Sequence, residues 1–526
     1  MAVKPWLGQF ETPDDPPAMS RDDPIMNLDL EYIYGYRCFD TRQNIFYTSN
    51  PNEIAYMAAA VGITLNTSAN TQKFMGAGES KTANGHTDDI TALCIHPDKT
   101  HIATGEVGKN PKVIVWSATT MQPVKSFRNG RGSRGITALA FSKDGSTLAS
   151  TALDNDHTVR VWNWNSGSKV HEAKGGPDKI LDANFSPKED TLLTVGIKHI
   201  YFWNGAKGWD KKKGIFGKVG PMCTLTSCGF LSTGVAVTGG SNGNIYLWEG
   251  NMCVKSVDIH DGRAASHTLR VDNDMIYTGG NDKKLHVLDA NLAKKSCHDM
   301  ESTPRAVDIK GNNIIVGCLN GDIVEISGTV KNKVMESHCD GEVWGLDINF
   351  NTPNLITTAG DDNKVRTWDV VQRKCVGSAT LDPKKGAERK AGYGASTLAS
   401  TSPNQQARCV AVQDSTGLVA LGYNDGCVEV RAGMDNLGST VNKQKLCNEW
   451  IETMHFSPDG KWLAVGSHDQ YIYIVSTSDW SLASKEQKHS SYITALDWSL
   501  DSKAIKSTCG AYELLYWSVD EAGKIV

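Results

Sequence analysis

The amino-acid sequence predicts an all-β fold made of tandem β-propellers. A unit of about 40–45 residues recurs along most of the 526-residue chain, which is the length of one four-stranded propeller blade. Within each unit, short stretches alternate apolar and polar residues, as half-buried strands do. Turns such as SKDGS and SPDGK separate these stretches and carry the Asp-Gly pair that tight hairpins favour.

The first 28 residues predict an extended arm. Five prolines interrupt this segment, and proline cannot continue a helix; they are Pro5, Pro13, Pro16, Pro17 and Pro24. Trp6, Leu7 and Phe10 are apolar side chains that a purely solvated tail does not need. We expect these three residues to anchor the arm on a neighbouring surface.

The stretch YGYRCFDTRQN, residues 34–44, precedes the first regular unit. Its aromatic and arginine residues suit either a binding site or a buried polar corner. We favour the corner, because no catalytic partners accompany them. The tyrosine rings of Tyr34 and Tyr36 are then buried with paired hydroxyls, and Arg37 and Arg42 form charge-assisted hydrogen bonds, with Asp40 as a candidate acid.

The clearest repeated unit spans residues 337–370 and ends in Trp368-Asp369, which is typical of WD repeats. His338 opens this unit, and Asp362 precedes Trp368 by six residues. Together with Thr357 or Thr358 they predict a hydrogen-bonded network that braces one blade. A catalytic triad is the alternative, but equivalent residues recur with the repeat instead of converging on one nucleophile.

Units of the same kind close at several other positions, which are Trp116, Trp162, Trp203, Trp248, Val475 and Trp517. Degenerate copies close at Leu288, Ile326 and Arg431. We therefore expect residues 29–330 to hold the segment that begins at Leu30 and a first propeller. Residues 331–526 then form a second, partial propeller with a polar insertion at 377–406.

Composition excludes several functional classes. The formal net charge of −5 gives no general basic footprint for nucleic acid. The 13 cysteines include no CxxC pair, so we expect neither a zinc site nor a disulfide framework, in a reducing compartment. The N-terminus lacks the apolar region of a signal peptide, and no apolar run reaches the ~20 residues of a membrane span.

Catalytic and nucleotide-binding motifs carry little weight. The stretch GRGSRG, residues 130–135, fits the pattern GxGxxG, but a strand follows it where a dinucleotide site needs a helix. The sequence contains no GxxxxGK[ST] or HExxH motif. We therefore expect no enzymatic activity, no cofactor and no metal.

Two basic stretches are candidate contacts to an acidic partner, although solvated loops are the simpler reading. The first contains Lys211, Lys212, Lys213 and Lys218. The second lies in the insertion and contains Lys384, Lys385, Arg389 and Lys390. Exposed lysines near a polyanion add affinity through local charge attraction.

The segment LEYIYGYRCFDTRQN resembles the HELP motif of the echinoderm microtubule-associated protein-like family. The matching residues are Leu30, Glu31, Tyr34, Gly35, Tyr36, Arg37, Arg42 and Asn44. Tyr32 stands where the family has tryptophan, and Gln43 where it has asparagine. The resemblance continues through KKKGIFGKVG and SPDGKWLAVGSHD, so it covers nearly the whole chain after the arm.

This resemblance implies a non-enzymatic scaffold that binds microtubules through tandem propellers, with the HELP segment packed into the first. It implies tubulin and other microtubule-associated or axonemal proteins as partners, in the cytoplasm, at the cytoskeleton or in a ciliary axoneme, with no nucleic acid or membrane. A WD-repeat adaptor for signalling or ubiquitin-type complexes is the alternative. The second propeller has four units where the family has more, so truncation, completion by a partner and an open arc all remain open.

Overall fold

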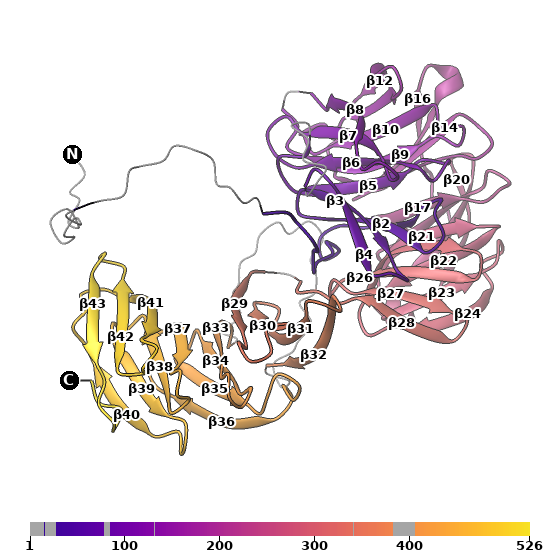
Figure 1. The fold of residues 1–526 in the computed structure, drawn as a ribbon. Helices are drawn as coiled ribbons and strands as arrows, with labels where there is room; N and C mark the ends of the chain where they lie inside the picture. The colour runs from indigo at the N-terminus through magenta and orange to yellow at the C-terminus, as the bar shows by residue number, and fades with distance from the viewer. Residues whose placement is uncertain are drawn as a thin grey trace. The chain divides into compact units, whose positions relative to one another are not determined.

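The computed structural model of the chain describes residues 15, 28–77, 85–130, 132–339, 341–381 and 405–525. These residues form two compact units, of which Leu28–Cys339 is the first and the residues after it make the second. Both units consist of antiparallel sheets, nearly all with four strands (Figure 1). Helix occurs in the described residues only as two short 3₁₀ turns, Gly205–Lys207 and Asp261–Arg263. The predicted all-β class is confirmed.

The first unit contains seven sheets of four consecutive strands each. Sheets one to four comprise β1 (Phe46–Tyr47), β2 (Glu53–Ala58), β3 (Val61–Asn66), β4 (Thr71–Met75), β5 (Ile90–Ile95), β6 (His101–Glu106), β7 (Lys112–Ser117), β8 (Pro123–Arg128), β9 (Ile136–Phe141), β10 (Thr147–Ala152), β11 (Val159–Asn163), β12 (Ser168–Ala173), β13 (Ile180–Phe185), β14 (Thr191–Gly196), β15 (His199–Asn204) and β16 (Asp210–Lys213).

Sheets five to seven comprise β17 (Leu225–Phe230), β18 (Ala236–Gly240), β19 (Asn244–Glu249), β20 (Met252–Asp258), β21 (Ser266–Asp272), β22 (Met275–Gly280), β23 (Lys284–Leu288), β24 (Lys294–Asp299), β25 (Pro304–Lys310), β26 (Asn313–Cys318), β27 (Ile323–Ser327) and β28 (Val330–Met335). Strand β28 pairs with β27, so the seventh sheet extends beyond the expected boundary at residue 330.

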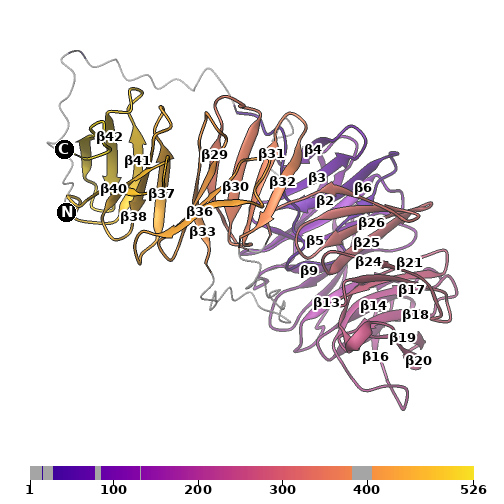
Figure 2. The same cartoon turned by 90° about the horizontal axis from the view of Figure 1, so that it is seen from below.

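The core of the first unit lies between neighbouring sheets. A cluster of buried apolar side chains fills each junction, for example Leu148, Trp162 and Phe127 between the second and third sheets. The cluster that joins the seventh sheet to the first contains Ala306, Ile315, Ile54 and Tyr56. The sheets therefore close into a ring (Figures 1 and 2). The shortest strand, β1, lies beside β25.

Short glycine turns join the first and second strands of several sheets. In the turn between β9 and β10, the Gly145 amide donates to the Ser142 carbonyl over 3.0 Å, with φ of 75° at the glycine. A side chain is strained at this φ, and a Cβ there would stand 2.1 Å from Nε2 of His96. The Asp-Gly turns read from the sequence thus set the packing between blades as well as the strand reversal.

The second unit contains four successive sheets. Their strands are β29 (Val343–Ile348), β30 (Leu355–Gly360), β31 (Lys364–Asp369), β32 (Lys374–Thr380), β33 (Ala407–Val412), β34 (Val419–Tyr423), β35 (Cys427–Arg431), β36 (Thr440–Lys445), β37 (Ile451–Phe456), β38 (Trp462–Ser467), β39 (Ile472–Ser476), β40 (Leu482–Glu486), β41 (Ile493–Trp498), β42 (Ala504–Cys509) and β43 (Leu514–Ser518). Residues 377–380 of the expected insertion belong to β32.

Apolar clusters fill the three junctions between these four sheets, as in the first unit. The fourth sheet has three strands among the described residues. The second unit is thus an arc of blades, in agreement with the partial second propeller expected from the sequence (Figure 1). The described part of the chain contains no helix long and apolar enough to cross a membrane.

Candidate functional site

The segment from Tyr34 to Asn44 lies at the junction between the seventh sheet and the first. The ring of Tyr36 is buried and meets Tyr56 edge-on, with 5.7 Å between ring centroids. Its hydroxyl donates to Oδ1 of Asn44 over 2.5 Å, and burial raises the pKa of Tyr36 well above its ordinary value. Tyr34 and Gly35 are half-buried beside them.

Arg37 joins this segment to the second sheet. Its guanidinium makes two hydrogen bonds to the Asp40 carboxylate, of 3.0 and 2.7 Å, and a further ion pair with Asp89 just before β5. The Arg37 carbonyl accepts hydrogen bonds from the side chains of Asn44 and Thr41, over 2.6 and 2.7 Å. The segment is therefore a polar corner tied together by its own side chains.

Arg42 and Gln43 extend into the centre of the first ring. They line a cavity of about 110 Å³ together with side chains of the inner strands, among them Asp182 and Arg270. Gln43 donates through Nε2 to the Leu269 carbonyl over 2.5 Å, and its backbone amide donates to the Arg305 carbonyl over 3.1 Å. The corner thus occupies part of the channel that an open propeller leaves at its axis.

Aspartates on inner strands link each of three blades to the next. Oδ2 of Asp182 accepts from the Cys228 amide over 2.8 Å, and Oδ2 of Asp347 accepts from the Val412 amide over 2.7 Å. Asp308 does the same for the amide of Tyr47, over 2.9 Å, and so joins the last blade of the first ring to the first.

Burial raises the pKa of Asp182 to about 6, even though backbone amides donate to its carboxylate. Asp308 also lies within reach of two cations, with Nε of Arg270 at 3.1 Å and Nζ of Lys99 at 3.5 Å. These aspartates are therefore structural links between blades. Burial disfavours the charge of Asp182, whereas two cations balance the charge of Asp308.

A second polar network braces individual blades. In the clearest repeat, the Trp368 indole donates to the Thr358 hydroxyl over 2.7 Å, and Arg366 pairs with Asp362 over 2.8 Å. His338 lies half-buried just before β29. Of the two threonines considered, Thr358 is the one that the tryptophan contacts.

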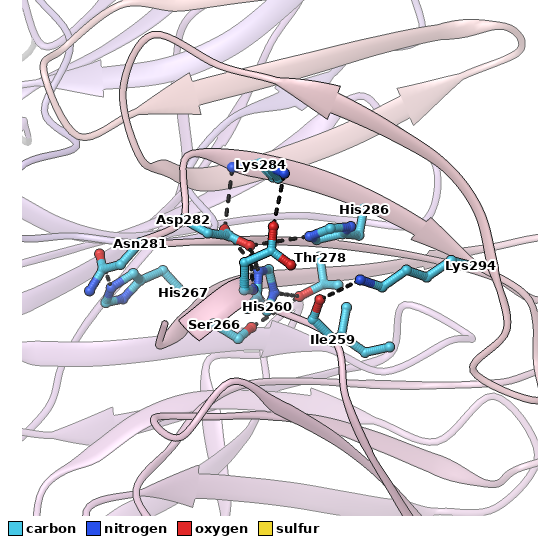
Figure 3. A network of polar contacts seen from close by, with 11 residues as sticks. Ile259, His260, Ser266, His267, Thr278, Asn281, Asp282, Lys284, His286 and Lys294 are labelled. Carbon is cyan, nitrogen blue, oxygen red and sulfur yellow. Dashed lines mark hydrogen bonds and ion pairs between the residues drawn. The ribbon is translucent and has the colours of Figure 1, made fainter. Parts of the chain in front are cut away.

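The blade of β21–β24 contains a variant of this network (Figure 3). Nδ1 of His260 lies 3.0 Å from both Asp282 oxygens, and its Nε2 lies 3.1 Å from the Thr278 hydroxyl. Nε2 of His286 is 3.2 Å from the same carboxylate. Although burial opposes it, these hydrogen bonds hold the pKa of Asp282 well below its usual range.

Asp362 and Asp282 occupy equivalent positions just before the third strand of their blades. The sequence did not reveal the role of the residue four positions after this aspartate. It contacts that aspartate, or an asparagine in its place, in several blades: Arg366 with Asp362, His286 with Asp282, Tyr473 with Asp469 and Tyr246 with Asn242. The residue type changes from blade to blade, so no single-letter pattern reveals the position. The constant separation of four residues from the aspartate is the sequence signal by which this position could be recognised.

The basic stretch at 210–218 lies on the outer strand β16 and the loop after it. Nζ of Lys211 lies 4.9 Å from the Tyr201 ring centroid and donates to the Lys174 carbonyl over 2.6 Å. Desolvation lowers the pKa of Lys211 accordingly. Lys212, Lys213 and Lys218 are exposed, and among the described residues their ammonium groups have no hydrogen-bond or ion-pair partner.

An exposed aromatic row crosses the second unit and was also missed. The Arg408 guanidinium lies between the rings of Trp344 and Trp450, at 4.6 and 4.5 Å from their centroids. His468 continues the row, with centroids 5.4 Å from Trp450 and 4.6 Å from Tyr492. Trp344, Trp450 and Tyr492 are 38–44% exposed, so the row both joins blades and faces outward.

Several predicted site residues lie outside the described residues. They are the arm residues Trp6, Leu7 and Phe10 and the insertion residues Lys384, Lys385, Arg389 and Lys390. Their roles stay predictions.

Comparison with known proteins agrees with this architecture. Family models match residues 83–326 as the echinoderm microtubule-associated protein first beta-propeller, residues 343–526 as its second beta-propeller and residues 23–63 as the HELP motif. The "Ciliary WD repeat-containing protein ctxp80" of Euplotoides octocarinatus is 38% identical, over 99% of this chain and 74% of that protein.

Two further relatives cover most of the chain. The 77 kDa echinoderm microtubule-associated protein of Strongylocentrotus purpuratus is 31% identical, over 96% of this chain and 71% of that protein. Echinoderm microtubule-associated protein-like 1 of Homo sapiens is 29% identical, over 96% of this chain and 60% of that protein. With the two propeller models and the HELP model matched in order, the chain belongs to the echinoderm microtubule-associated protein-like family.

Proposed function

We propose that this chain is a non-enzymatic scaffold that binds microtubules through the surfaces of its propellers. Its relatives support this: two carry the name of microtubule-associated proteins, and a third is named as a ciliary protein. The same names favour a place on the cytoskeleton, with stable ciliary doublet microtubules as one lattice. Axonemal and other microtubule-associated proteins are the further partners.

The basic stretch formed by β16 and the loop after it is the contact surface that the structure favours, and this geometry carries the proposal. The loop is pinned to the next blade: the Ile215 amide donates to the Asn251 carbonyl over 2.8 Å, and the Cys253 amide donates to the Ile215 carbonyl over 2.9 Å. The lysines on either side, Lys213 and Lys218, are therefore presented by an anchored segment.

Apolar side chains border these cations. Ile215 is 48% exposed and Met252 is 45% exposed, and the two form a parallel β-bridge. A surface that combines free ammonium groups with apolar side chains suits an acidic protein surface such as that of tubulin, because charge attraction steers the encounter and apolar burial retains it. Lys211 contributes less, because its ammonium already contacts the blade.

Co-sedimentation with taxol-stabilised microtubules at low and raised salt tests the proposal. We expect Lys212→Glu with Lys213→Glu to weaken pelleting by roughly ten-fold, as two charge contacts of about 0.7 kcal/mol each would give. A matched control reverses Lys143 and Lys188, which are exposed on turns of neighbouring blades. Equal loss in both variants would reject this basic stretch as the contact surface.

The adaptor function is the second candidate, and the aromatic row of the second unit favours it. Trp344, Trp450 and Tyr492 offer rigid, half-exposed rings of the kind that protein interfaces use as anchors. A wild-type chain that does not pellet with microtubules at low salt would favour this candidate over the scaffold. The arm residues and the insertion lysines remain proposed contacts in either case.

A further inference from the structure

The last blade of the second unit brings together three side chains that can bind a metal. His489 lies just before β41, Cys509 ends β42, and Glu513 lies just before β43. Nδ1 of His489 is 3.2 Å from Oε2 of Glu513, and Sγ of Cys509 is 3.1 Å from the same oxygen. All three ligand atoms lie within 4.8 Å of one another.

These separations are close to those in a zinc site. Zinc bonds of about 2.0–2.3 Å in tetrahedral geometry place neighbouring ligand atoms about 3.3–3.6 Å apart. One imidazole nitrogen, one thiolate and one carboxylate form a ligand set that zinc accepts, with a water in the fourth position. The three side chains therefore need to move apart only slightly to admit the ion.

Outer contacts already orient two of the three ligands. The Ser507 hydroxyl lies 2.7 Å from Nε2 of His489, which leaves Nδ1 directed at Cys509 and Glu513. Ser490 donates twice to the Glu513 carboxylate, from its amide over 2.9 Å and from its hydroxyl over 2.7 Å. Such contacts hold the ligands of metal sites in position and fix the histidine tautomer.

The bracing network of a blade does not require the thiol. In two other blades the second strand ends in glycine, at Gly280 and Gly360, where β42 ends in Cys509. The histidine–carboxylate pair of His260 and Asp282 forms with no cysteine (Figure 3). Cys509 is therefore an addition to the network, placed where its sulfur reaches both other ligands.

The histidine-rich cluster in the blade of β21–β24 is less suited to an ion. His260, Asp282 and His286 also lie within 4.8 Å of one another, but their side chains are at most 4% exposed and contain no sulfur. The side chain of Glu513, in contrast, is 32% exposed, so an ion can enter and keep a water ligand. The cluster of His489, Cys509 and Glu513 does not match the usual Cys and His spacings of zinc motifs. Its ligands are separated by 20 and 4 residues, and one of them is a glutamate.

We propose that His489, Cys509 and Glu513 bind a zinc ion that ties the loop before β41 to the β42–β43 turn. On binding, the Cys509 thiol loses its proton to solvent, and the His489 imidazole keeps one proton on Nε2, facing Ser507. The ion then joins the loop before β41, the end of β42 and the β42–β43 turn. Its role is to stabilise the second unit, independently of microtubule binding.

The test uses the full chain, stripped of metal with a chelator, and Zn²⁺ or Co²⁺ alone as the probe. We expect one equivalent of Zn²⁺ to bind and to raise the unfolding midpoint of the second unit, and Co²⁺ to give a thiolate charge-transfer band. Cys509→Ser should abolish the band and lower Zn²⁺ affinity by at least ~100-fold. Glu513→Gln, which keeps a side-chain oxygen for Ser490, should also weaken binding.

His286→Gln is the matched control, since it removes one ligand from the cluster of His260 and Asp282 and should leave Zn²⁺ affinity unchanged. Loss of binding in this variant alone would place the ion at His260 and Asp282 and overturn the proposal. Unchanged affinity in Cys509→Ser, or no Co²⁺ band in the wild type, would overturn it as well. If Cys509→Ser fails to fold, Glu513→Gln and the wild-type Co²⁺ spectrum still decide.

Discussion

The ring of Tyr36 lies directly against Gly317, so closely that a Cβ on Gly317 would stand 2.1 Å from the tyrosine hydroxyl oxygen. Gly317 belongs to β26 in the seventh sheet, whereas Tyr36 belongs to the segment that precedes the first sheet. The absence of a side chain on one partner thus lets the other fill the junction at which the ring closes. The HELP segment is in this sense part of the core.

We expect Gly317→Ala to destabilise the first propeller by roughly 1–3 kcal/mol, because the added methyl overpacks a buried ring. Urea unfolding measures this change. Gly438→Ala is the control, because nothing lies within 4 Å of a Cβ at that position. A Gly317→Ala protein as stable as the control would show that Tyr36 moves aside at no cost.

Arg37→Ala should lower the free energy of unfolding by roughly 1–3 kcal/mol, since it leaves Asp40 and Asp89 without their charge-assisted partner. Arg37→Lys should recover part of the loss, because an ammonium can keep one of the contacts. Microtubule pelleting of the folded protein should not change. A fully stable variant that no longer pelleted would instead make this corner a contact surface.

The buried pair of Arg366 and Asp362 predicts a non-additive pair of substitutions, because both side chains are at most 4% exposed. Arg366→Met should cost about 3–5 kcal/mol, since it leaves a buried carboxylate without its cation. Adding Asp362→Asn should restore a large part of that loss in a double-mutant cycle. Lys461→Ala, at an exposed ion pair, should change stability by less than about 0.5 kcal/mol. Additive losses at Arg366 and Asp362 would contradict this account.

Asp182 predicts a pH dependence of the first propeller. Its pKa is raised from 3.8 to about 6, so the folded state holds the proton more tightly than the unfolded state. Stability therefore falls as pH rises through this window, by up to about 3 kcal/mol, and the penalty is complete above it. Asp182→Asn removes the titration, so its stability relative to wild type should rise between about pH 4 and pH 7. A constant difference across that range would count against a raised pKa.

The repeat allowed the blades to be predicted well. Period, alternation and turn residues act within one blade, so a single sequence carries them, and the seven-sheet first ring and the partial second propeller follow. Contacts between blades were not predicted, because they depend on the register of strands that belong to different units. The Asp182–Cys228 and Asp347–Val412 links are of this kind.

The candidate contact surface was predicted only as a cluster of lysines. Composition cannot show that the Lys211 ammonium contacts Tyr201 while that of Lys212 stays free. The two residues follow one another on one strand, and successive side chains of a strand point to opposite faces. Nor could it show that Ile215 and Met252 lie side by side, since the bridge joins two sheets. The sequence indicated the charge, whereas the apolar border required the structure.

The hydrogen bond from the Tyr47 amide to Asp308 spans 261 residues of sequence, and it has a consequence for biosynthesis. At roughly 5–20 residues per second, a ribosome needs about 13–50 s to make the chain between these two residues. During that interval Ile54 and Tyr56 of the first blade lack the side chains of the seventh sheet against which they pack in the folded ring. Ring closure therefore has to follow synthesis of the seventh sheet, and during that interval the uncovered side chains of the first blade are a surface that a chaperone could bind.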